Sequence, residues 1–176
     1  KREKTYIPVE KCSLSDKARL LSAVQKMVPI FTAGMPQYGV EVLDPMKMYD
    51  MEYDLSGLQF SLTGGTYKGL MNAVVDDFNW DTQKKEFTID FRTDTQVTGP
   101  YTAAGHVAHL PISGNGHMVL NMKNLYVKIQ IPFEIEKKDN KDYVRPTKYS
   151  FEFDVKDHAD FDLFNLFDGD KDKSKC

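Results

Sequence analysis

The stretch LYVKIQIPFEI at residues 125–135 decides the fold class. Its apolar residues stand at every second position over eleven residues. A period of two is typical of a β-strand that turns one face to an apolar environment. Strands of globular proteins usually have about five or six residues, so this one is long. The stretch therefore predicts a large antiparallel sheet with one apolar face.

The same period recurs on both sides of this stretch. In EFTIDF at residues 86–91, the apolar side chains occupy alternate positions, and they do so again at residues 149–155. The charged run EKKDNKD at residues 136–142 separates two such stretches and predicts a hairpin tip. At residues 49–62 the alternation slips by one position at Ser56-Gly57. A slip at a glycine predicts a β-bulge, which would bend the sheet.

The N-terminal part has a different period. Apolar residues recur at helical spacing within residues 13–33. Ser13 with Asp16 resembles a capping box, and Gly34 is the expected cap at the other end. Pro29 should kink the last turn, because it lacks a backbone donor and crowds the preceding turn. We expect one helix here, preceding the sheet.

Length and composition restrict the possible classes. The 176 residues fit one domain that buries roughly 70% of its unfolded surface without a metal or disulfide. The net charge of −3 does not favour nucleic-acid binding, and the apolar runs are too short for stable membrane insertion. Aromatic residues make up 12% and favour a bulky β-rich interior. We expect an α+β fold whose long sheet encloses a helix or an apolar cavity.

Three of the four histidines lie in HVAHLPISGNGHMVLNM at residues 106–122. We expect a hairpin that turns at Gly114-Asn115, through a loop of two residues or of the four residues 113–116. His106 and His117 would then lie roughly 20 Å apart, too far for a shared metal. A phosphate loop would need a third glycine and a following helix, and neither is present. The sequence predicts no metal site and no cofactor.

Catalytic motifs are also absent from the pattern. No serine stands in a G-x-S-x-G elbow, and Cys12 has no evident basic partner. The carboxylates of Asp76-Asp77 and of residues 154–160 have the appearance of solvated turns. We expect a protein that is not an enzyme. A hydrolase whose catalytic residues meet only in the folded chain is a third hypothesis.

Several segments, in their order along the chain, resemble the insect juvenile-hormone-binding protein and Takeout family. The segments are KCSLSD at 11–16, GMPQYGVEVLDP at 34–45, GLQFSLTGGTYKGLMNAVVDDF at 57–78, GPYTAAGHVAHLPISGNGHMVLNM at 99–122 and FDLFNLFDGDK at 161–171. The resemblance implies a strongly curved antiparallel sheet wrapped around a helix, known as a super-roll, with a tunnel for one small apolar ligand. It also implies a secreted, extracellular carrier of the haemolymph and no enzymatic activity.

Two departures from the family pattern are visible. Arg19 stands where the family usually has a second cysteine, so that Cys12 pairs either with Cys176 or with nothing. The family pattern also continues past this point into a long C-terminal helix. We therefore expect one domain over residues 1–176, truncated at its C-terminus as a fragment or a short isoform, with a polar tail at 168–176.

The expected ligand-binding residues are apolar side chains of the alternating stretches, together with Phe31 of the helix and two tyrosines that could orient a carbonyl or carboxylate. They are Phe31, Phe60, Leu62, Phe87, Ile89, Phe91, Tyr101, Met118, Leu120, Met122, Ile129, Ile131, Tyr149, Phe151 and Phe153.

The leading functional hypothesis is a secreted carrier of a small hydrophobic ligand, such as a terpenoid hormone, a fatty acyl chain or a similar lipid. The alternative is a non-enzymatic interaction or regulatory module. Such a module would dimerise, or borrow a helix from a protein partner, through its exposed apolar sheet face.

Overall fold

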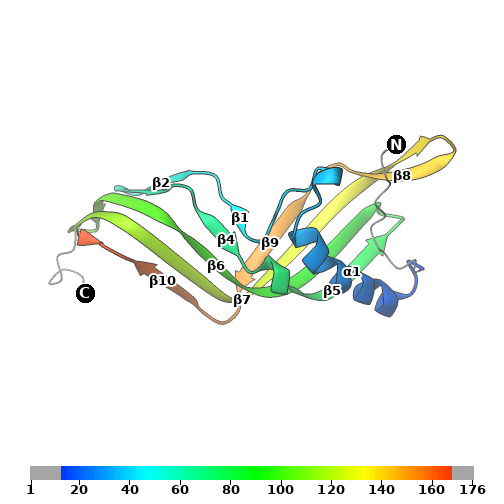
Figure 1. Cartoon of the computed structure of the whole chain (residues 1–176), viewed down its shortest axis with the longest axis horizontal. Coiled ribbons are helices and arrows are strands. Elements are labelled where there is room, and N and C mark those ends of the chain that lie inside the picture. Colours follow the sequence, from blue (N-terminus) through cyan, green and yellow to red (C-terminus); the bar gives the residue numbers. More distant parts are fainter. Residues whose placement is uncertain (1–12, 168–176) are drawn as a thin grey trace.

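The computed structural model describes residues 13–167 and contains one α-helix, two short 3-10 helices and a ten-stranded antiparallel sheet (Figure 1). The helices are α1 (Lys17–Thr32), η1 (Pro36–Tyr38) and η2 (Leu70–Asn72). The strands are β1 (Met46–Lys47), β2 (Met51–Leu55), β3 (Leu58–Leu62), β4 (Thr66–Lys68), β5 (Val74–Asp81), β6 (Glu86–Val107), β7 (Leu110–Lys138), β8 (Lys141–Pro146), β9 (Ser150–Val155) and β10 (Ala159–Leu163). The predicted α+β class is therefore observed.

Strands β6 and β7 form one long hairpin that runs through the whole molecule (Figure 1). Their pairing extends from Val107 opposite Leu110 to Glu86 opposite Pro132. The chain reverses at Ala108-His109, where Ala108 has a φ of 52°. The prediction of a hairpin turn at Gly114-Asn115 is wrong, because both residues lie within β7.

The shorter strands flank this hairpin in two groups. In one half of the sheet, β3 and β4 pair with β6, β2 pairs with β3, β1 pairs with β4, and β10 pairs with β7. In the other half, β5 pairs with β6, while β8 and β9 pair with β7 (Figure 1). The charged tip predicted at residues 136–142 is confirmed as the turn between β7 and β8.

The phase slip at Ser56-Gly57 is a tight turn, so the predicted bulge is wrong. Ser56 and Gly57 both have positive φ angles, of 54° and 103°, and Leu55 pairs directly with Leu58. A two-residue hairpin turn of this kind requires positive φ at both central positions, which a glycine adopts readily. The register instead shifts between Val75 and Asp77 in β5 and between Thr93 and Thr95 in β6.

Helix α1 begins one turn later than its predicted cap. The carboxylate of Asp16, not the Ser13 hydroxyl, accepts a hydrogen bond from the Arg19 amide at 3.2 Å. Pro29 lies within the helix, which continues to Thr32, and Gly34 follows with a φ of 85°. No helix within residues 13–167 has the length and apolar character needed to cross a membrane.

α1 packs against β5 and η2, at one end of the sheet (Figure 1). Gln25 fixes this position with both ends of its side-chain amide. Its nitrogen donates to the Ala73 carbonyl at 2.9 Å, and its oxygen accepts from the Val75 amide at 2.7 Å. The helix is thereby tied to the first residues of β5.

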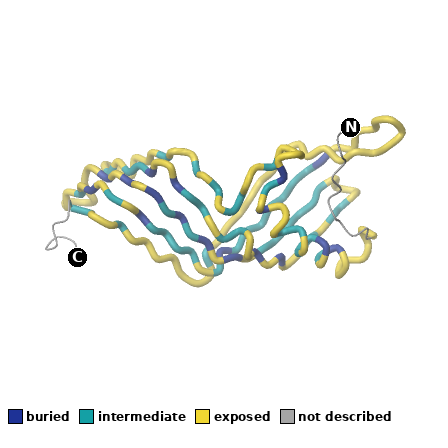
Figure 2. The backbone as a smooth tube through the Cα atoms, in the orientation of Figure 1, coloured by how far each residue is buried: buried dark blue, intermediate teal, exposed yellow. Residues whose placement is uncertain are grey.

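Burial alternates along the strands, most regularly in the second half of β6 (Figure 2). There Thr95, Val97, Gly99, Tyr101 and Ala103 are buried, while the residues that alternate with them are more exposed. Because paired residues share a side of the sheet, the register assigns every strand residue to one of two faces. We call the side that carries Val97 and Tyr101 the apolar face and the opposite side the polar face.

Candidate ligand-binding face

The apolar face continues across both halves of the sheet. In one half, Leu62 pairs with Tyr101 and Phe60 with Ala103. In the other half, the register places Phe87 opposite Ile131, Ile89 opposite Ile129 and Phe91 opposite Val127. β9 extends this row, with Phe151 opposite Ile129 and Phe153 opposite Val127. Residues from β3, β6, β7 and β9 thus present one connected apolar surface.

The first half of this face contains a group of buried side chains, among them Tyr101 and Leu62, which are 1% and 2% exposed. We call them the Tyr101 cluster: Leu62, Val97, Tyr101, Ala103 and Met118. The ring of Phe60 stacks on that of Tyr101, with centroids 5.7 Å apart and planes at 12°. The Tyr101 hydroxyl donates to the Phe164 carbonyl at 3.0 Å, which attaches the segment after β10 to the cluster.

The second half carries a group of aromatic rings, the Trp80 cluster, formed by Phe78, Trp80, Phe87 and Phe133. Trp80 and Phe87 stack with centroids 5.4 Å apart, and the Trp80 and Phe133 rings are 4.8 Å apart. The two remaining ring contacts in the cluster involve Phe87 as well. Stacked rings bury large apolar areas and give a flat surface suited to an apolar ligand.

Phe78, Trp80 and Phe133 were absent from the predicted ligand-binding residues. Phe133 was within the alternating stretch 125–135, and Phe78 and Trp80 alternate with polar residues in VVDDFNW. The bulge at Asp76 explains why Val75 and Phe78 share the apolar face despite their odd spacing. The adjacent aspartates Asp76 and Asp77 break the alternation of apolar and polar residues, and this break was the sequence signal for the bulge.

The predicted ligand-binding residues fall into three sets. Those within or against the Tyr101 cluster are Phe60, Leu62, Tyr101, Met118, Leu120 and Met122. Those on the apolar face of the second half are Phe87, Ile89, Phe91, Ile129, Ile131, Phe151 and Phe153. Phe31 on α1 and Tyr149 before β9 belong to neither set, and they are 45% and 68% exposed.

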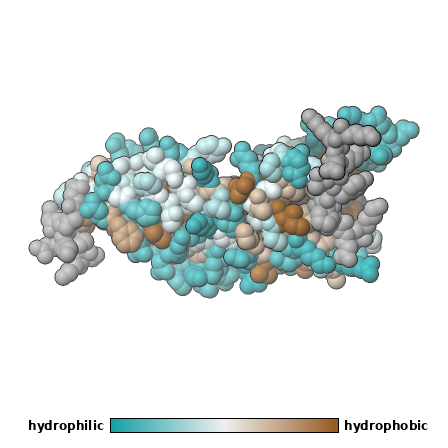
Figure 3. All heavy atoms as spheres, in the orientation of Figure 1, coloured by the Kyte–Doolittle hydropathy of each residue, from teal (hydrophilic) through white to brown (hydrophobic). Residues whose placement is uncertain are grey.

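Much of the second half remains accessible on the apolar face. Phe151 and Phe153 are 59% and 65% exposed, while their strand neighbours Ile129 and Val127 are half-buried. Figure 3 shows hydrophobic side chains exposed in separate patches among hydrophilic ones on the side of the molecule in view. Scattered exposed apolar residues are ordinary, but a row on one sheet face is typical of a binding surface.

Three hydroxyl groups lie in the apolar face near the shift between its halves, and that of Thr93 donates to the Gly69 carbonyl. Thr95 on β6 faces Met122, and Tyr67 on β4 faces Val97. Burial raises the pKa of the Tyr67 phenol, and the neighbouring Thr95 hydroxyl offsets part of this rise. Within an otherwise apolar surface, these groups are the ones suited to orient a ligand.

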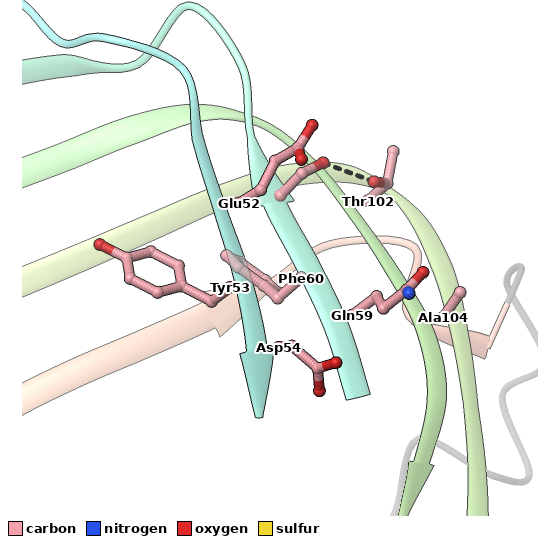
Figure 4. A pocket seen from close by; sticks show the side chains of 8 residues that line it. Glu52, Tyr53, Asp54, Gln59, Phe60, Thr102 and Ala104 are labelled. Carbon is pink, nitrogen blue, oxygen red and sulfur yellow. Dashed lines mark hydrogen bonds between the residues drawn. The ribbon is translucent and has the colours of Figure 1, made fainter. Parts of the chain in front are cut away.

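The polar face has a different character. A cleft of about 490 Å³ lies over β2, β3 and β6, where the hydroxyls of Ser61 and Thr102 are 2.6 Å apart. Figure 4 shows Tyr53 and Phe60 directed away from Gln59 and Ala104, toward the opposite side of the sheet. The cleft is therefore lined mainly by exposed polar side chains, and an apolar ligand would gain little there.

The histidines do not converge. His106 pairs with Pro111, His109 lies in the turn between β6 and β7, and His117 pairs with Pro100. Within residues 13–167, no three histidine, cysteine or acidic side chains gather closely enough to hold a metal ion. The expected cysteine pairing of Cys12 with Cys176 and the polar tail at 168–176 lie outside the described residues.

Comparison with known proteins agrees with this architecture. The profile of the family described as haemolymph juvenile hormone binding protein matches residues 2–175. The circadian clock-controlled protein daywake of Drosophila yakuba is 28% identical over 94% of this chain and 68% of its own length. The juvenile hormone-binding protein of Manduca sexta is 31% identical over 50% of this chain and 40% of its own length.

The crystal structure of Epiphyas postvittana Takeout 1 has the same fold, with a TM-score of 0.87. It is 47% identical to this chain, and the match covers 94% of this chain and 77% of that one. The super-roll fold class predicted from the sequence is thereby confirmed. The chain belongs to the haemolymph juvenile hormone binding protein family, whose members bind small hydrophobic ligands.

Proposed function

We propose that this chain is a secreted carrier that holds one small hydrophobic molecule against the apolar face of its sheet. The observation that carries the proposal is the continuity of this face from the Tyr101 cluster to the Trp80 cluster along β6 and β7. A terpenoid or a fatty acyl lipid has the length and apolar character for such a surface. Binding would come from transfer of the ligand out of water, at about 25 cal/mol per Å² of apolar area.

The first experiment identifies the natural ligand. The protein is purified from the source animal, and native mass spectrometry is compared before and after extraction with organic solvent. We expect one stoichiometric lipid or terpenoid. If the extracted and unextracted proteins have the same mass, and the protein associates as its concentration rises, the interaction-module alternative replaces the carrier.

The second experiment places the ligand on the apolar face. The chain has a single tryptophan, Trp80, whose emission can be transferred to bound N-phenyl-1-naphthylamine. We expect Ile129→Ser to weaken binding of this dye roughly tenfold, since it removes apolar area from the middle of the face. The control is Gln130→Ser on the next residue, which lies on the polar face. Equal affinities of the two variants would contradict the proposed site.

Secretion is tested separately, by an antibody against the chain. We expect the protein in cell-free haemolymph of the source animal. Its restriction to washed cells would contradict an extracellular carrier.

A further inference from the structure

Thr95 has an unusual position for a polar side chain. It lies on β6 where the register with β7 shifts, and it is 4% exposed. Its hydroxyl oxygen has no hydrogen-bond partner. Thr93, two residues earlier, is equally buried, but its hydroxyl donates to the Gly69 carbonyl at 2.5 Å. A buried hydroxyl without a partner destabilises the fold, so its presence needs an explanation.

Tyr67 provides a second hydroxyl beside it. Tyr67 pairs with Val97 and so lies on the apolar face, one strand away from Thr95. The Thr95 hydroxyl is close enough to lower the pKa of the Tyr67 phenol against the larger effect of burial. Thr95 Oγ1 makes no hydrogen bond of good geometry, so its interaction with the phenol is a weak one. Two O–H donors are thus adjacent within an apolar surface.

The charges nearby restrict what these donors could bind. Asp44 is close enough to raise the pKa of Tyr67, and its carboxylate is held in place by the amides of Gly69 and Met71 at 3.1 and 2.7 Å. Lys68, next to Tyr67 on β4, pairs with Gln96 and lies on the polar face. A negatively charged oxygen would therefore meet a like charge, while a neutral acceptor would not.

We propose that the Thr95 hydroxyl, with the Tyr67 phenol beside it, donates to a neutral acceptor oxygen of the bound molecule and so fixes its position along the apolar face. This rests on the proposed function. The ligand class is then an apolar chain that carries a ketone, ester, ether or similar group. A saturated or unsaturated hydrocarbon without oxygen would bind by apolar contact alone, and a carboxylate would be disfavoured.

The test compares three probes of equal chain length: 2-pentadecanone, pentadecane and pentadecanoate. Each displaces N-phenyl-1-naphthylamine from the wild-type protein, and the affinities are read from Trp80 energy transfer. We expect the ketone to bind roughly three- to tenfold more tightly than the hydrocarbon, as one net hydrogen bond would give. Pentadecanoate should bind more weakly than the ketone.

Two variants remove the donors with little change of shape, Thr95→Val and Tyr67→Phe. Each should reduce the preference for the ketone and leave pentadecane binding unchanged. Thr98→Val is the matched control, because Thr98 lies on the polar face of the same strand, opposite Thr66. It should leave the preference as in the wild type.

Thermal unfolding of the free protein shows whether the Thr95 hydroxyl positions the ligand or only stabilises the fold. Thr95→Val should leave Tm unchanged or raise it, since it removes an unpartnered buried polar group. If Thr95→Val lowers Tm and leaves the preference for the ketone unchanged, the Thr95 hydroxyl stabilises the fold and does not position the ligand. If all three probes bind with equal affinity, the proposed hydrogen bond to the ligand is wrong, while the proposed carrier function is retained. If none binds, both the carrier function and the hydrogen bond are contradicted.

Discussion

Gly116 lies directly beneath the backbone of the segment that follows β10. A Cβ atom at this position would be 2.0 Å from the Phe164 carbonyl oxygen. A Cβ atom at Gly114 would be 3.1 Å from the Cα atom of Leu166, with which Gly114 forms an isolated β-bridge. The side-chain amide nitrogen of Asn165 donates to the Asn115 carbonyl at 2.8 Å. These glycines therefore permit two backbones to approach closely within a continuous strand.

We expect Gly116→Ala to destabilise the protein by about 1–3 kcal/mol, because the added methyl group must displace backbone rather than a flexible side chain. Unfolding in urea measures this change. Asn115→Ala is the control, because it keeps the carbonyl that accepts from Asn165, and it should stay within about 0.5 kcal/mol. An equally small effect of Gly116→Ala would show that the close contact between Gly116 and Phe164 does not constrain the stability of the protein.

The two glycines also show a limit of sequence reading at this scale. A Gly-Asn-Gly triplet flanked by Ser113 and His117 fits a hairpin turn as well as a close approach to a distant segment. The partner here, Phe164–Leu166, is about fifty residues away along the chain, and no local pattern announces it. Ser56-Gly57 was ambiguous in the same way, since a turn and a bulge both shift the alternation by one position.

At the scale of the strands, the shift between β6 and β7 is held by one carboxylate. Asp94 accepts from the Asn124 amide at 2.9 Å and from the Lys123 ammonium at 2.7 Å. Asn124 has a positive φ of 53°, at the point where β7 carries its extra residue. These interactions, the Asn124 amide first, hold the pKa of Asp94 below its usual value.

This lowered pKa makes a prediction about acid stability. A group whose pKa is lower in the folded state contributes stability above its unfolded pKa, near 4, and loses it as the pH falls through the folded value. We expect Asp94→Asn to reduce the loss of stability between pH 5 and pH 3, measured by urea unfolding. Asp162→Asn on β10 changes the net charge equally and serves as control. Identical pH profiles of wild type and Asp94→Asn would refute the role of this carboxylate.

Alternation predicted strands correctly at the start of β6, in the second half of β7 and in β9. It identified these elements because one face of each is apolar, a property that a single strand already displays. It could not assign partners. Phe78, Trp80 and Phe133 become one aromatic group only through the pairing of β5 with β6 and of β6 with β7.

At the scale of the whole molecule, the sheet has two chemically distinct sides. The described helices cover the β5 end, while Phe151 and Phe153 on β9 remain more than half exposed. Thirteen of the fifteen predicted ligand-binding residues fall on the apolar face or in its core, since strand residues of one parity share a side. Their contact with a ligand stays a prediction.

An apolar row of this kind should bind a hydrophobic dye. We expect the variant with Phe151→Ser and Phe153→Ser to bind anilinonaphthalene sulfonate more weakly than the wild type, because exposed apolar surface is what the dye reports. Its stability should change little, as both rings are largely in solvent. Glu152→Ser lies between them on the polar face and is the control. Unchanged dye binding in the double variant would exclude β9 from the accessible apolar surface.

The β6–β7 hairpin, whose pairing is offset only by the register shift between Thr93 and Thr95, has a consequence for how the chain folds. Its innermost rung joins Val107 to Leu110, and its outermost rung joins Glu86 to Pro132, so each new rung closes a loop only slightly larger than the last. Pairing that starts at the Ala108-His109 turn and proceeds outward can therefore form the central hairpin of this sheet with a small entropic cost at every step. During synthesis, β6 can pair with β3, β4 and β5, which precede it in the chain, whereas its other edge stays unpaired until β7 has emerged. β8, β9 and β10 can then attach to β7.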